Sequence, residues 1–326
     1  MTTIQQQPHH PAIAALLGLA VGDALGVPYE FVSREKLRES PAVGMIGYGT
    51  HNQPAGTWSD DAALTFCLAE SLLGGYDLRD MAAKFVAWFD QGYWSAHGKV
   101  FDIGNTTLQS IRHLDELLSN TEGSDAFQQL TRIENEYENG NGSLMRILPL
   151  LFYLKGWPLQ QQFERIHEVS ALTHRHSRAA MSCLIYLRLA EHLLNGKEKI
   201  SAYHQMREEI MAFWEEISWP EDECAHFERI IGQNILETDP EILEASGYVI
   251  ATLEAVLYFF LRENNYKDTV LHLVNLGFDT DTVAAIGGGL AGLHYGLSDI
   301  PEDWLAAIAR RDDIETLGRR LGGKYP

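Results

Sequence analysis

Apolar residues recur at intervals of three and four positions along almost all of the 326 residues. This spacing places them on one face of an α-helix, whereas a half-buried strand requires strict alternation. Glycine, proline and asparagine interrupt the pattern where helices would end. The expected helical segments are Ile13–Leu25, Ala62–Leu73, Met81–Trp94, Leu108–Leu118, Phe163–Leu172, Ala179–Leu194, Tyr203–Ile217, Tyr248–Leu261, Val270–Leu276, Val283–Leu293 and Trp304–Ala309.

Only Val43–Tyr48 is a candidate strand, and it is short and flanked by glycine. The pattern therefore predicts an all-α fold with about a dozen helices. No long linker or repeat divides the chain, so we expect a single compact multi-helical domain over residues 12–326. Residues 1–11 lack the basic region and apolar core of a signal peptide, and we expect them to form a flexible leader.

The formal charge of −20, from 45 acidic and 25 basic residues, disfavours a nucleic-acid partner and is compatible with bound cations or a basic protein partner. Three widely spaced cysteines, Cys67, Cys183 and Cys224, predict neither a disulfide framework nor a thiolate zinc site. The apolar stretch Gly247–Leu261 is short for a membrane span and contains Glu254. We therefore expect a cytoplasmic protein with no membrane partner, and a monomer, because no coiled-coil or exposed apolar stripe is evident.

Two aspartate-rich segments from opposite parts of the chain each precede an expected helix. Residues Gly56–Ala62 have the sequence Gly-Thr-Trp-Ser-Asp-Asp-Ala, and Gly277–Thr282 have Gly-Phe-Asp-Thr-Asp-Thr. One polar residue at each helix start is an ordinary N-cap, and acidic residues there suit the helix dipole. Adjacent carboxylates exceed what capping needs, and they repel each other unless a cation neutralises them. Their hard oxygen atoms suit Mg²⁺ or Mn²⁺, and the two segments together could hold two such ions.

The segment Asp279–Val283 also satisfies the DxDx(T/V) signature of haloacid-dehalogenase-type phosphatases. Those enzymes place the signature after a first hydrophobic strand, with a lysine and a further acidic pair downstream. Only 44 residues follow Thr282, and the residues before the signature have helical spacing. We therefore interpret this match as accidental.

Glycine-rich loops are the other candidate binding elements. Gly104–Thr107 and Gly140–Arg146 combine glycines with small polar residues, whose backbone N–H groups can cradle phosphate oxygens. Neither loop matches a Walker lysine loop or a dinucleotide fingerprint. His174 and His176 lie between two expected helices, where they could bind a metal, contact a ligand or be structural. The small residues of Leu16–Glu30, which include Asp23, are more simply explained by close helix packing.

Taken in order, these segments resemble the ADP-ribosylglycohydrolase family, over about Ile13 to Tyr295. Each motif alone is modest, whereas six in the same order are specific. One position departs from the family pattern, because Ala62 replaces a usual threonine, which costs a hydrogen bond but leaves the ligand oxygens intact. The matching motifs are Gly18–Gly26 with Glu30, Trp58–Asp61, Gly104–Thr107, Gly140–Arg146, Thr173–His176 and Gly277–Thr282.

The resemblance implies an all-α hydrolase with two Mg²⁺ or Mn²⁺ ions that cleaves the N-glycosidic bond between ADP-ribose and a modified side chain. Implied catalytic residues are Glu30 and Asp61, which would help deprotonate the water that attacks ribose C1″. Implied metal ligands are Ser59, Asp60, Asp61, Asp279, Asp281 and Thr282. Implied contacts to the ADP-ribose are Gly104, Asn105, Gly140, Asn141, Gly142, Ser143 and His174.

Among substrates, ADP-ribosylarginine in a protein is favoured, because the compact bacterial relatives that the chain resembles mostly act there. The alternatives are an ADP-ribosylserine linkage, O-acetyl-ADP-ribose, or a non-catalytic relative that binds ADP-ribose or is structural. The intact ligand set argues against the last alternative. Some relatives are immunity proteins, so a cognate ADP-ribosyltransferase toxin is a further expected partner, compatible with the negative charge.

Overall fold

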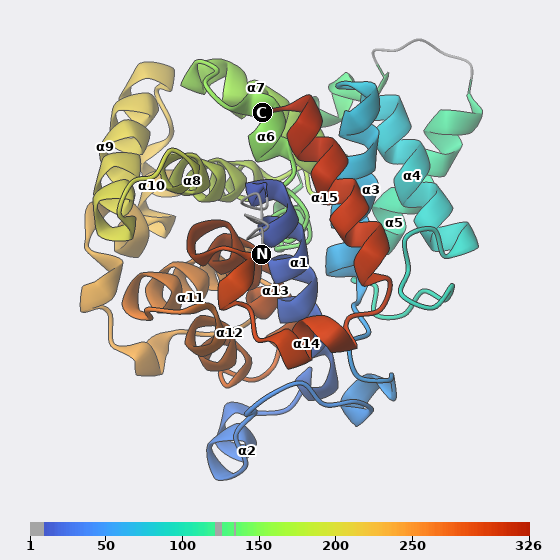
Figure 1. The fold of residues 1–326 in the computed structure, drawn as a ribbon. Helices are drawn as coiled ribbons and strands as arrows, with labels where there is room; N and C mark the ends of the chain where they lie inside the picture. The colour runs from blue at the N-terminus through green and yellow to red at the C-terminus, as the bar shows by residue number, and fades with distance from the viewer. Residues whose placement is uncertain (1–9, 121–125, 134) are drawn as a thin grey trace, which may run out of the picture.

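The computed structural model describes residues 10–120, 126–133 and 135–326, which form the all-helical fold that the spacing predicts (Figure 1). In these ranges no strand occurs, and only two isolated bridges, Tyr48–Gln53 and Gly140–Tyr248, join extended residues. The α-helices are α1 (Pro11–Gly26), α2 (Arg34–Glu39), α3 (Asp60–Gly74), α4 (Leu78–Gln91), α5 (Asn105–Ser119), α6 (Leu150–Leu154), α7 (Leu159–Ala171), α8 (Ser177–Leu194), α9 (Lys199–Ile217), α10 (Glu221–His226), α11 (Val249–Arg262), α12 (Tyr266–Val274), α13 (Thr280–Tyr295), α14 (Glu302–Ala307) and α15 (Arg311–Lys324).

Short helices of other types fill several of the connections. A π-helix, η6, spans Glu228–Gly232. The 3-10 helices are η1 (Val27–Tyr29), η2 (Gly49–His51), η4 (Gln128–Arg132), η5 (Glu136–Glu138), η7 (Ile235–Glu237), η8 (Pro240–Ile242) and η9 (Leu297–Asp299). The tight turns of η1 and η2 matter most for function, because they lie beside the candidate site.

Every helical segment expected from the spacing overlaps an observed α-helix, whereas α2, α6, α10 and α15 were not expected. The expected segment Met81–Trp94 extends too far, because α4 ends at Gln91. The next residue, Gly92, adopts the left-handed conformation (φ 68°) that terminates the helix. The candidate strand Val43–Tyr48 does not form, apart from the bridge at Tyr48.

The expected leader is only partly described. Its residues 1–9 lie outside the described ranges. Its last two residues were assigned wrongly, because Pro11 is the first residue of α1 and the His10 side chain caps this helix by accepting a hydrogen bond from the N–H group of Ala12 (3.1 Å). Proline suits this position, since its missing N–H would have had no intrahelical partner.

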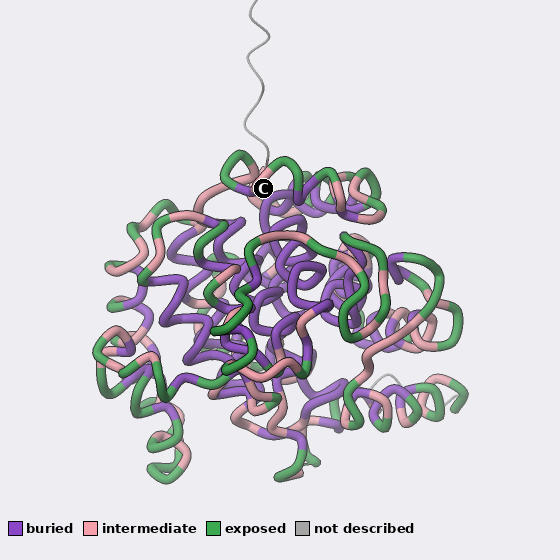
Figure 2. The backbone as a smooth tube through the Cα atoms, turned by 90° about the horizontal axis from the view of Figure 1, so that it is seen from below, coloured by how far each residue is buried: buried purple, intermediate pink, exposed green. Residues whose placement is uncertain are grey.

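Helices α1 and α13 lie at the centre of the molecule (Figure 1) and are almost completely buried. Most of the backbone in the middle of the molecule is likewise buried (Figure 2). The two helices run antiparallel and approach so closely that side chains are excluded between them. A Cβ atom at Gly18 would lie 2.4 Å from the Gly288 carbonyl oxygen, and one at Gly22 would lie 2.0 Å from that of Ala284. The Thr280 hydroxyl also donates a hydrogen bond to the Gly26 carbonyl (2.8 Å). This contact fixes the end of α1 beside the start of α13.

Residues Pro11–Tyr29 are long and apolar enough to cross a membrane, with a mean hydropathy of 1.6. They form a longer apolar helix than the Gly247–Leu261 stretch singled out from the sequence. However, 94% of this window is buried inside the protein. The apolar composition of α1 is therefore explained by its central place in the core.

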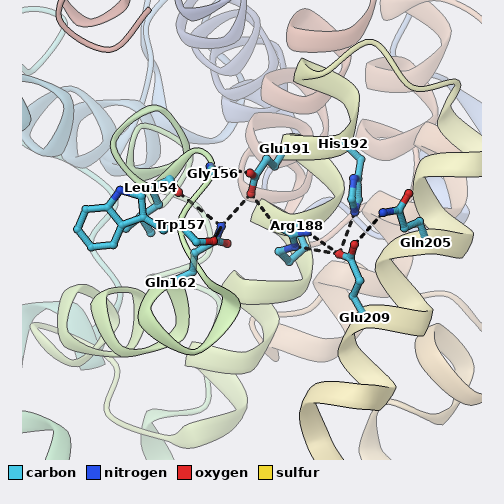
Figure 3. A network of polar contacts seen from close by, with 9 residues as sticks. All are labelled: Leu154, Gly156, Trp157, Gln162, Arg188, Glu191, His192, Gln205 and Glu209. Carbon is cyan, nitrogen blue, oxygen red and sulfur yellow. Dashed lines mark hydrogen bonds and ion pairs between the residues drawn. The ribbon is translucent and has the colours of Figure 1, made fainter. Parts of the chain in front are cut away.

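Charged residues of α8 and α9, with Gln162 of α7, form a network of polar contacts (Figure 3). Arg188 donates to Glu191 (2.6 Å) and to Glu209 (2.5 Å), and His192 lies 3.0 Å from the same oxygen of Glu209. The remaining contacts come from neutral donors: Gln162 and the Gly156 N–H group to Glu191, and Gln205 to Glu209. Every carboxylate oxygen of this Arg188 network therefore has at least one donor.

Candidate active site

Three helix ends meet at one point, namely the carboxyl end of α1 and the amino ends of α3 and α13. Asp23 of α1 joins two of them, because its carboxylate accepts hydrogen bonds from the backbone N–H groups of Ser59 (2.8 Å), the residue before α3, and of Ala62 (2.9 Å) in its first turn. The first turn of a helix leaves such N–H groups without an intrahelical partner. Asp23 is fully buried. The explanation of this segment by helix packing alone missed that role.

The two aspartate segments come together at this point, as the sequence predicts for a shared site. Acidic oxygens here form two overlapping groups, in each of which one oxygen per residue lies within 4.8 Å of the others. The first group is Asp23, Asp61 and Asp281, and the second is Glu30, Asp279 and Asp281. With the neighbouring Asp60, the five aspartates are called the aspartate cluster below.

Helix capping explains only part of these residues. Ser59 is the N-cap of α3, where its hydroxyl accepts from the N–H group of Asp61 (3.3 Å) and donates to the Asp61 carboxylate (2.9 Å). Asp279 occupies the N-cap position of α13 without a side-chain cap, and its carboxylate instead accepts from the Asn141 amide (2.7 Å). The Thr282 hydroxyl donates to Asp61 (3.4 Å) and so links the two segments.

Two buried carboxylate oxygens, Oδ1 of Asp61 and Oδ2 of Asp281, have no hydrogen-bond partner. Burial raises the pKa of both aspartates well above the ordinary value, and neighbouring carboxylates, Asp23 beside Asp61 and Asp61 beside Asp281, raise it further. A cation would supply both the missing partner and the missing positive charge. The residues of the cluster therefore fit a divalent cation with hard oxygen ligands.

Glu30 lies beside the cluster but has a basic partner. Its Oε2 contacts Nε2 of His51, and the Thr50 hydroxyl donates to its backbone carbonyl (2.7 Å). Burial raises the pKa of Glu30 to about 7, although the hydrogen bond with His51 opposes this shift. The same hydrogen bond raises the pKa of His51. In the metal-free protein, Glu30 can therefore both accept and release a proton near neutral pH.

The glycine loops lie together on another side of the site. Gly104–Thr107, which begins at the N-cap of α5, and Gly140–Gly142 both line the same cavity as His174. A Cβ atom at Gly142 would lie 2.5 Å from the His174 ring and 3.1 Å from the Thr107 hydroxyl. Only glycine allows these three segments to meet. We call them the glycine cradle, because the start of α5 and the loop backbone offer N–H groups to an anion.

His174 contributes a neutral side chain to the glycine cradle. Burial lowers its pKa to about 3, and the positive charges of Arg146 and Arg175 act in the same direction. The Thr173 hydroxyl accepts a hydrogen bond from Arg146 (2.7 Å) and lies 3.0 Å from Nδ1 of His174. Its own hydrogen is free to bond Nδ1, so we assign the His174 proton to Nε2. That nitrogen is then a hydrogen-bond donor beside the loop.

A cavity of about 860 Å³ reaches from the aspartate cluster to the glycine cradle. Of the residues predicted for the site, its walls contain Glu30, Asp60, Gly104, Asn105, Gly140, Asn141, Gly142, His174, Asp279 and Thr282. Four others, Ser59, Asp61, Asp281 and Ser143, lie behind the walls and are buried. Ser143 differs from the other three because its side chain contacts residues outside the aspartate segments. Its hydroxyl accepts a hydrogen bond from Ser170 (2.8 Å) and lies 3.7 Å from the Cys183 sulfur.

The cavity wall also contains residues that were not predicted, among them Phe31, Asp102 and Phe278. The negative charge of Asp102 contributes to the raised pKa values of Glu30 and Asp60, after burial and nearer groups. Phe31 and Phe278 directly adjoin the predicted residues Glu30 and Asp279. Both phenylalanines are exposed, and helical spacing does not predict the exposure of a single phenylalanine.

The described residues thus form an all-helical fold in which one cavity joins buried carboxylates to glycine-rich loops. The family model described as ADP-ribosylglycohydrolase matches residues 5–326. The chain therefore belongs to the ADP-ribosylglycohydrolase family, which confirms the resemblance found in the motifs.

Individual relatives are similar over most of their length. The ADP-ribosylarginine hydrolase Tri1 of Serratia proteamaculans is 32% identical over 318 residues, which cover 95% of this chain and 78% of the relative. The ADP-ribosyl-[dinitrogen reductase] glycohydrolase of Rhodospirillum rubrum is 29% identical, with 94% of this chain and 93% of the relative covered. A solved structure described as an ADP-ribosylglycohydrolase-related protein complex superimposes with a TM-score of 0.77 at 29% identity, covering 97% of this chain and 98% of that chain.

Proposed function

We propose that this chain removes ADP-ribose from ADP-ribosylated arginine side chains of proteins by metal-dependent hydrolysis. The observation that carries the proposal is that one cavity brings the aspartate cluster, whose buried charge is uncompensated, next to the glycine cradle. The cluster suits divalent cations, and the cradle suits a diphosphate. The name of the Serratia relative, an ADP-ribosylarginine hydrolase, supports the choice of linkage.

Six residues would hold two Mg²⁺ or Mn²⁺ ions: Ser59, Asp60, Asp61, Asp279, Asp281 and Thr282. Bound ions supply Lewis-acid polarisation and compensate negative charge on the substrate. The unpartnered oxygens of Asp61 and Asp281 support this assignment. Asp23 has a different role, because both of its oxygens already accept N–H groups of α3, so it adds negative charge and positions the helix.

Glu30 would act as the general base, taking a proton from the water that attacks ribose C1″. The water oxygen forms the new bond to C1″, the bond from C1″ to the guanidino nitrogen breaks, and the proton is passed on to that nitrogen as arginine leaves. Asp61 would help to orient and activate this water, and two hydroxyl donors, from Ser59 and Thr282, hold its carboxylate in place. His174 and the backbone N–H groups of the glycine cradle would bind the diphosphate.

The test measures release of ADP-ribose from an arginine-ADP-ribosylated protein, with Mg²⁺ and with EDTA. Asp60→Asn and Asp279→Asn remove one charge from each aspartate segment. Asp115→Asn is the matched control, because Asp115 is exposed on α5 and lies outside the cavity wall. We expect release that requires the metal, is lost in both cluster variants and is unchanged in the control.

Isothermal titration with ADP-ribose separates the other outcomes. Tight binding without release from the arginine substrate would contradict the linkage and point to another bond or to a binding role. Neither binding nor release would contradict the whole proposal. Release that is equal in Mg²⁺ and in EDTA would contradict the metal requirement alone.

The proposal includes several finer points that rest on the sequence. We propose one domain over residues 12–326 and a monomer in the cytoplasm, where the free thiols of the buried Cys67 and Cys183 would stay reduced. Immunity against a cognate ADP-ribosyltransferase toxin remains a prediction from the family resemblance. Its test is growth protection in cells that express such a transferase, with Asp279→Asn as the variant expected to lose protection.

A further inference from the structure

Two phenylalanines are exposed in the wall of the cavity, where apolar side chains would ordinarily be covered. Phe31 is 67% exposed and Phe278 is 54% exposed. Each adjoins a site residue, because Phe31 follows Glu30 and Phe278 precedes Asp279. Exposed large apolar side chains inside a cavity commonly mark a contact with a ligand. We call these two residues the aromatic pair.

The backbone of the aromatic pair is held in a conformation that phenylalanine rarely adopts. Both residues have positive φ, 62° for Phe31 and 60° for Phe278. The Phe31 N–H group donates to the Phe278 carbonyl (2.7 Å), and the Phe278 N–H group donates to the Val32 carbonyl (2.8 Å). A non-glycine residue in this left-handed region is strained. The two segments therefore retain rings at positions that glycine would occupy without strain.

The position of the aromatic pair indicates which part of the substrate it would meet. Asn141 of the glycine cradle donates to Asp279 of the aspartate cluster, and Phe278 immediately precedes Asp279. Asp279 is therefore flanked by the glycine cradle, through Asn141, and by the aromatic pair, through Phe278. A substrate with its diphosphate on the cradle and its ribose C1″ at the cluster would direct its leaving group toward the aromatic pair.

The charge around the aromatic pair indicates the chemistry of that group. Three exposed carboxylates line the same cavity, namely Glu35, Glu241, which is paired with Arg38, and Glu244. The arginine in this wall, Arg34, is already engaged with the backbone carbonyls of Pro240, Glu241 and Leu243 at 3.0–3.2 Å. Among the described residues, no hydrogen bond or ion pair engages the Glu244 carboxylate. A positively charged group would therefore find both aromatic faces and free negative charge here.

We infer that Phe31 and Phe278, with Glu244 beside them, form the binding site for the aglycone, the guanidinium and adjoining residues of the modified arginine. This inference rests on the proposed function and adds its specificity determinant. A guanidinium is planar and delocalised, and it stacks on aromatic rings. The acidic wall would also attract basic residues next to the modified arginine. A contact with the leaving group thus explains why phenylalanine occupies two positions with a strained backbone.

The test replaces the rings without adding strain. Phe31→Gly, Phe278→Gly and the double variant keep a residue that tolerates positive φ. We expect KM for an arginine-ADP-ribosylated peptide to rise about tenfold in the double variant, the size of cation–π contacts, with little change in kcat. The Kd of free ADP-ribose, which has no aglycone, should stay the same. The melting temperature should not fall, because glycine relieves the strained backbone.

Conservative and remote variants control for structural effects. Phe278→Tyr retains an aromatic face, so its KM should equal that of the wild type. Tyr137→Ala removes an aromatic side chain that is 87% exposed but lies outside the cavity wall, and it should change nothing. Glu244→Gln should raise KM about threefold at low ionic strength, with the difference lost in high salt.

Two results would overturn the inference by itself. If the wild type releases ADP-ribose from the peptide and the double glycine variant has the same KM, the rings do not bind the aglycone. If the Kd of free ADP-ribose weakens in parallel with KM, the rings contact the ADP-ribose instead. A wild type that does not release ADP-ribose from arginine at all overturns the proposed function, and this inference falls with it.

Discussion

The aspartate cluster and the Arg188 network are two ways of placing carboxylates inside a helical protein. In the network, both oxygens of Glu191 and of Glu209 have donors, and Arg188 balances part of their charge (Figure 3). In the cluster, oxygens of Asp61 and Asp281 have no partner. The two regions also differ in pKa. Despite partial burial, hydrogen bonds from His192, Arg188 and Gln205 lower the pKa of Glu209 to about 2, whereas burial and mutual repulsion raise the pKa values of the cluster.

This difference separates carboxylates that are satisfied within the protein from carboxylates that are available to a ligand. A fully hydrogen-bonded network is satisfied in the protein alone. The cluster is incomplete in the protein alone, and it stays folded because the surrounding helices α1, α3 and α13 hold it in place. The unpartnered carboxylates therefore mark this cavity as the candidate functional site, whereas burial of charge by itself does not.

The largest expected effect is on activity in the cluster. Asp281→Asn removes one negative charge at similar volume, and we expect kcat to fall by about 10³-fold or more, a loss of about 4 kcal/mol in transition-state stabilisation. Without metal, the free energy of unfolding should be equal to or higher than that of the wild type, since a repulsive charge is gone. Turnover and thermal unfolding in EDTA measure the two quantities. A variant that is both less active and clearly less stable in EDTA would show that the charge is structural.

The opposite pattern is expected in the Arg188 network. Arg188→Met leaves Glu191 and Glu209 without their cation, and we expect the free energy of unfolding to fall by about 3 kcal/mol while kcat at 25 °C stays unchanged. Denaturant unfolding measures the first quantity. Lys84→Met is the control, because Lys84 forms a more exposed pair with Asp80 (3.3 Å), and its loss should cost less than about 1 kcal/mol. Equal losses in both variants would remove the distinction between satisfied and solvent-exposed pairs.

The fold could be predicted from the sequence wherever packing uses apolar side chains. Helix α15 was missed because it is rich in charged residues and has few apolar ones. It also packs against α1 through a glycine. A Cβ atom at Gly318 would lie 2.8 Å from the Cα atom of Ile13. Spacing of apolar side chains cannot reveal a contact that depends on the absence of a side chain. The same limit hid the full length of the approach between α1 and α13.

The segments that meet at the candidate site could be predicted where a local motif marks them, as it does for the two aspartate segments and the glycine loops. Asp23 and His51 act through contacts with residues distant in the chain, so no local pattern marks them. His51 follows Tyr48 and Gly49, which have positive φ (72° and 54°), and this tight turn directs its ring to Glu30. Its role depends on tertiary geometry alone.

The contact between His51 and Glu30 is intermediate between the Arg188 network and the aspartate cluster. Glu30 lies at the candidate site but has a basic partner, whereas the unpartnered oxygens of Asp61 and Asp281 have none. We expect His51→Ala to lower kcat about tenfold by releasing the Glu30 side chain from its position. The Kd of ADP-ribose should not change. His51→Gln retains a nitrogen that can reach Glu30 and should recover most of the activity. If Gln and Ala variants have equal kcat, the contact does not position Glu30.

The smallest expected effect is an opposite response of the two regions to pH. In the metal-free protein, burial raises the pKa of Asp23 to about 7, well above its value in the unfolded chain. The folded state therefore binds more protons than the unfolded state between about pH 4 and 7, so the Asp23 contribution to stability rises as pH falls through this range. The pKa of Glu209 is lowered to about 2, so its contribution is present above about pH 4.5 and is lost as pH falls toward 2.

Differences between variants isolate these regions, because charges distant from the substituted residue titrate equally in both proteins being compared. In EDTA, the melting temperature of Asp23→Asn minus that of the wild type should decrease between pH 8 and pH 5, since the wild type gains stability that the variant lacks. For Glu209→Gln, the same difference should stay constant over this range and become less negative only below about pH 4.5. With Mg²⁺ present, the first trend should weaken, because a bound cation favours ionised carboxylates and so opposes protonation. If both differences change in the same direction between pH 8 and pH 5, the pKa values of Asp23 and Glu209 are not shifted in opposite directions.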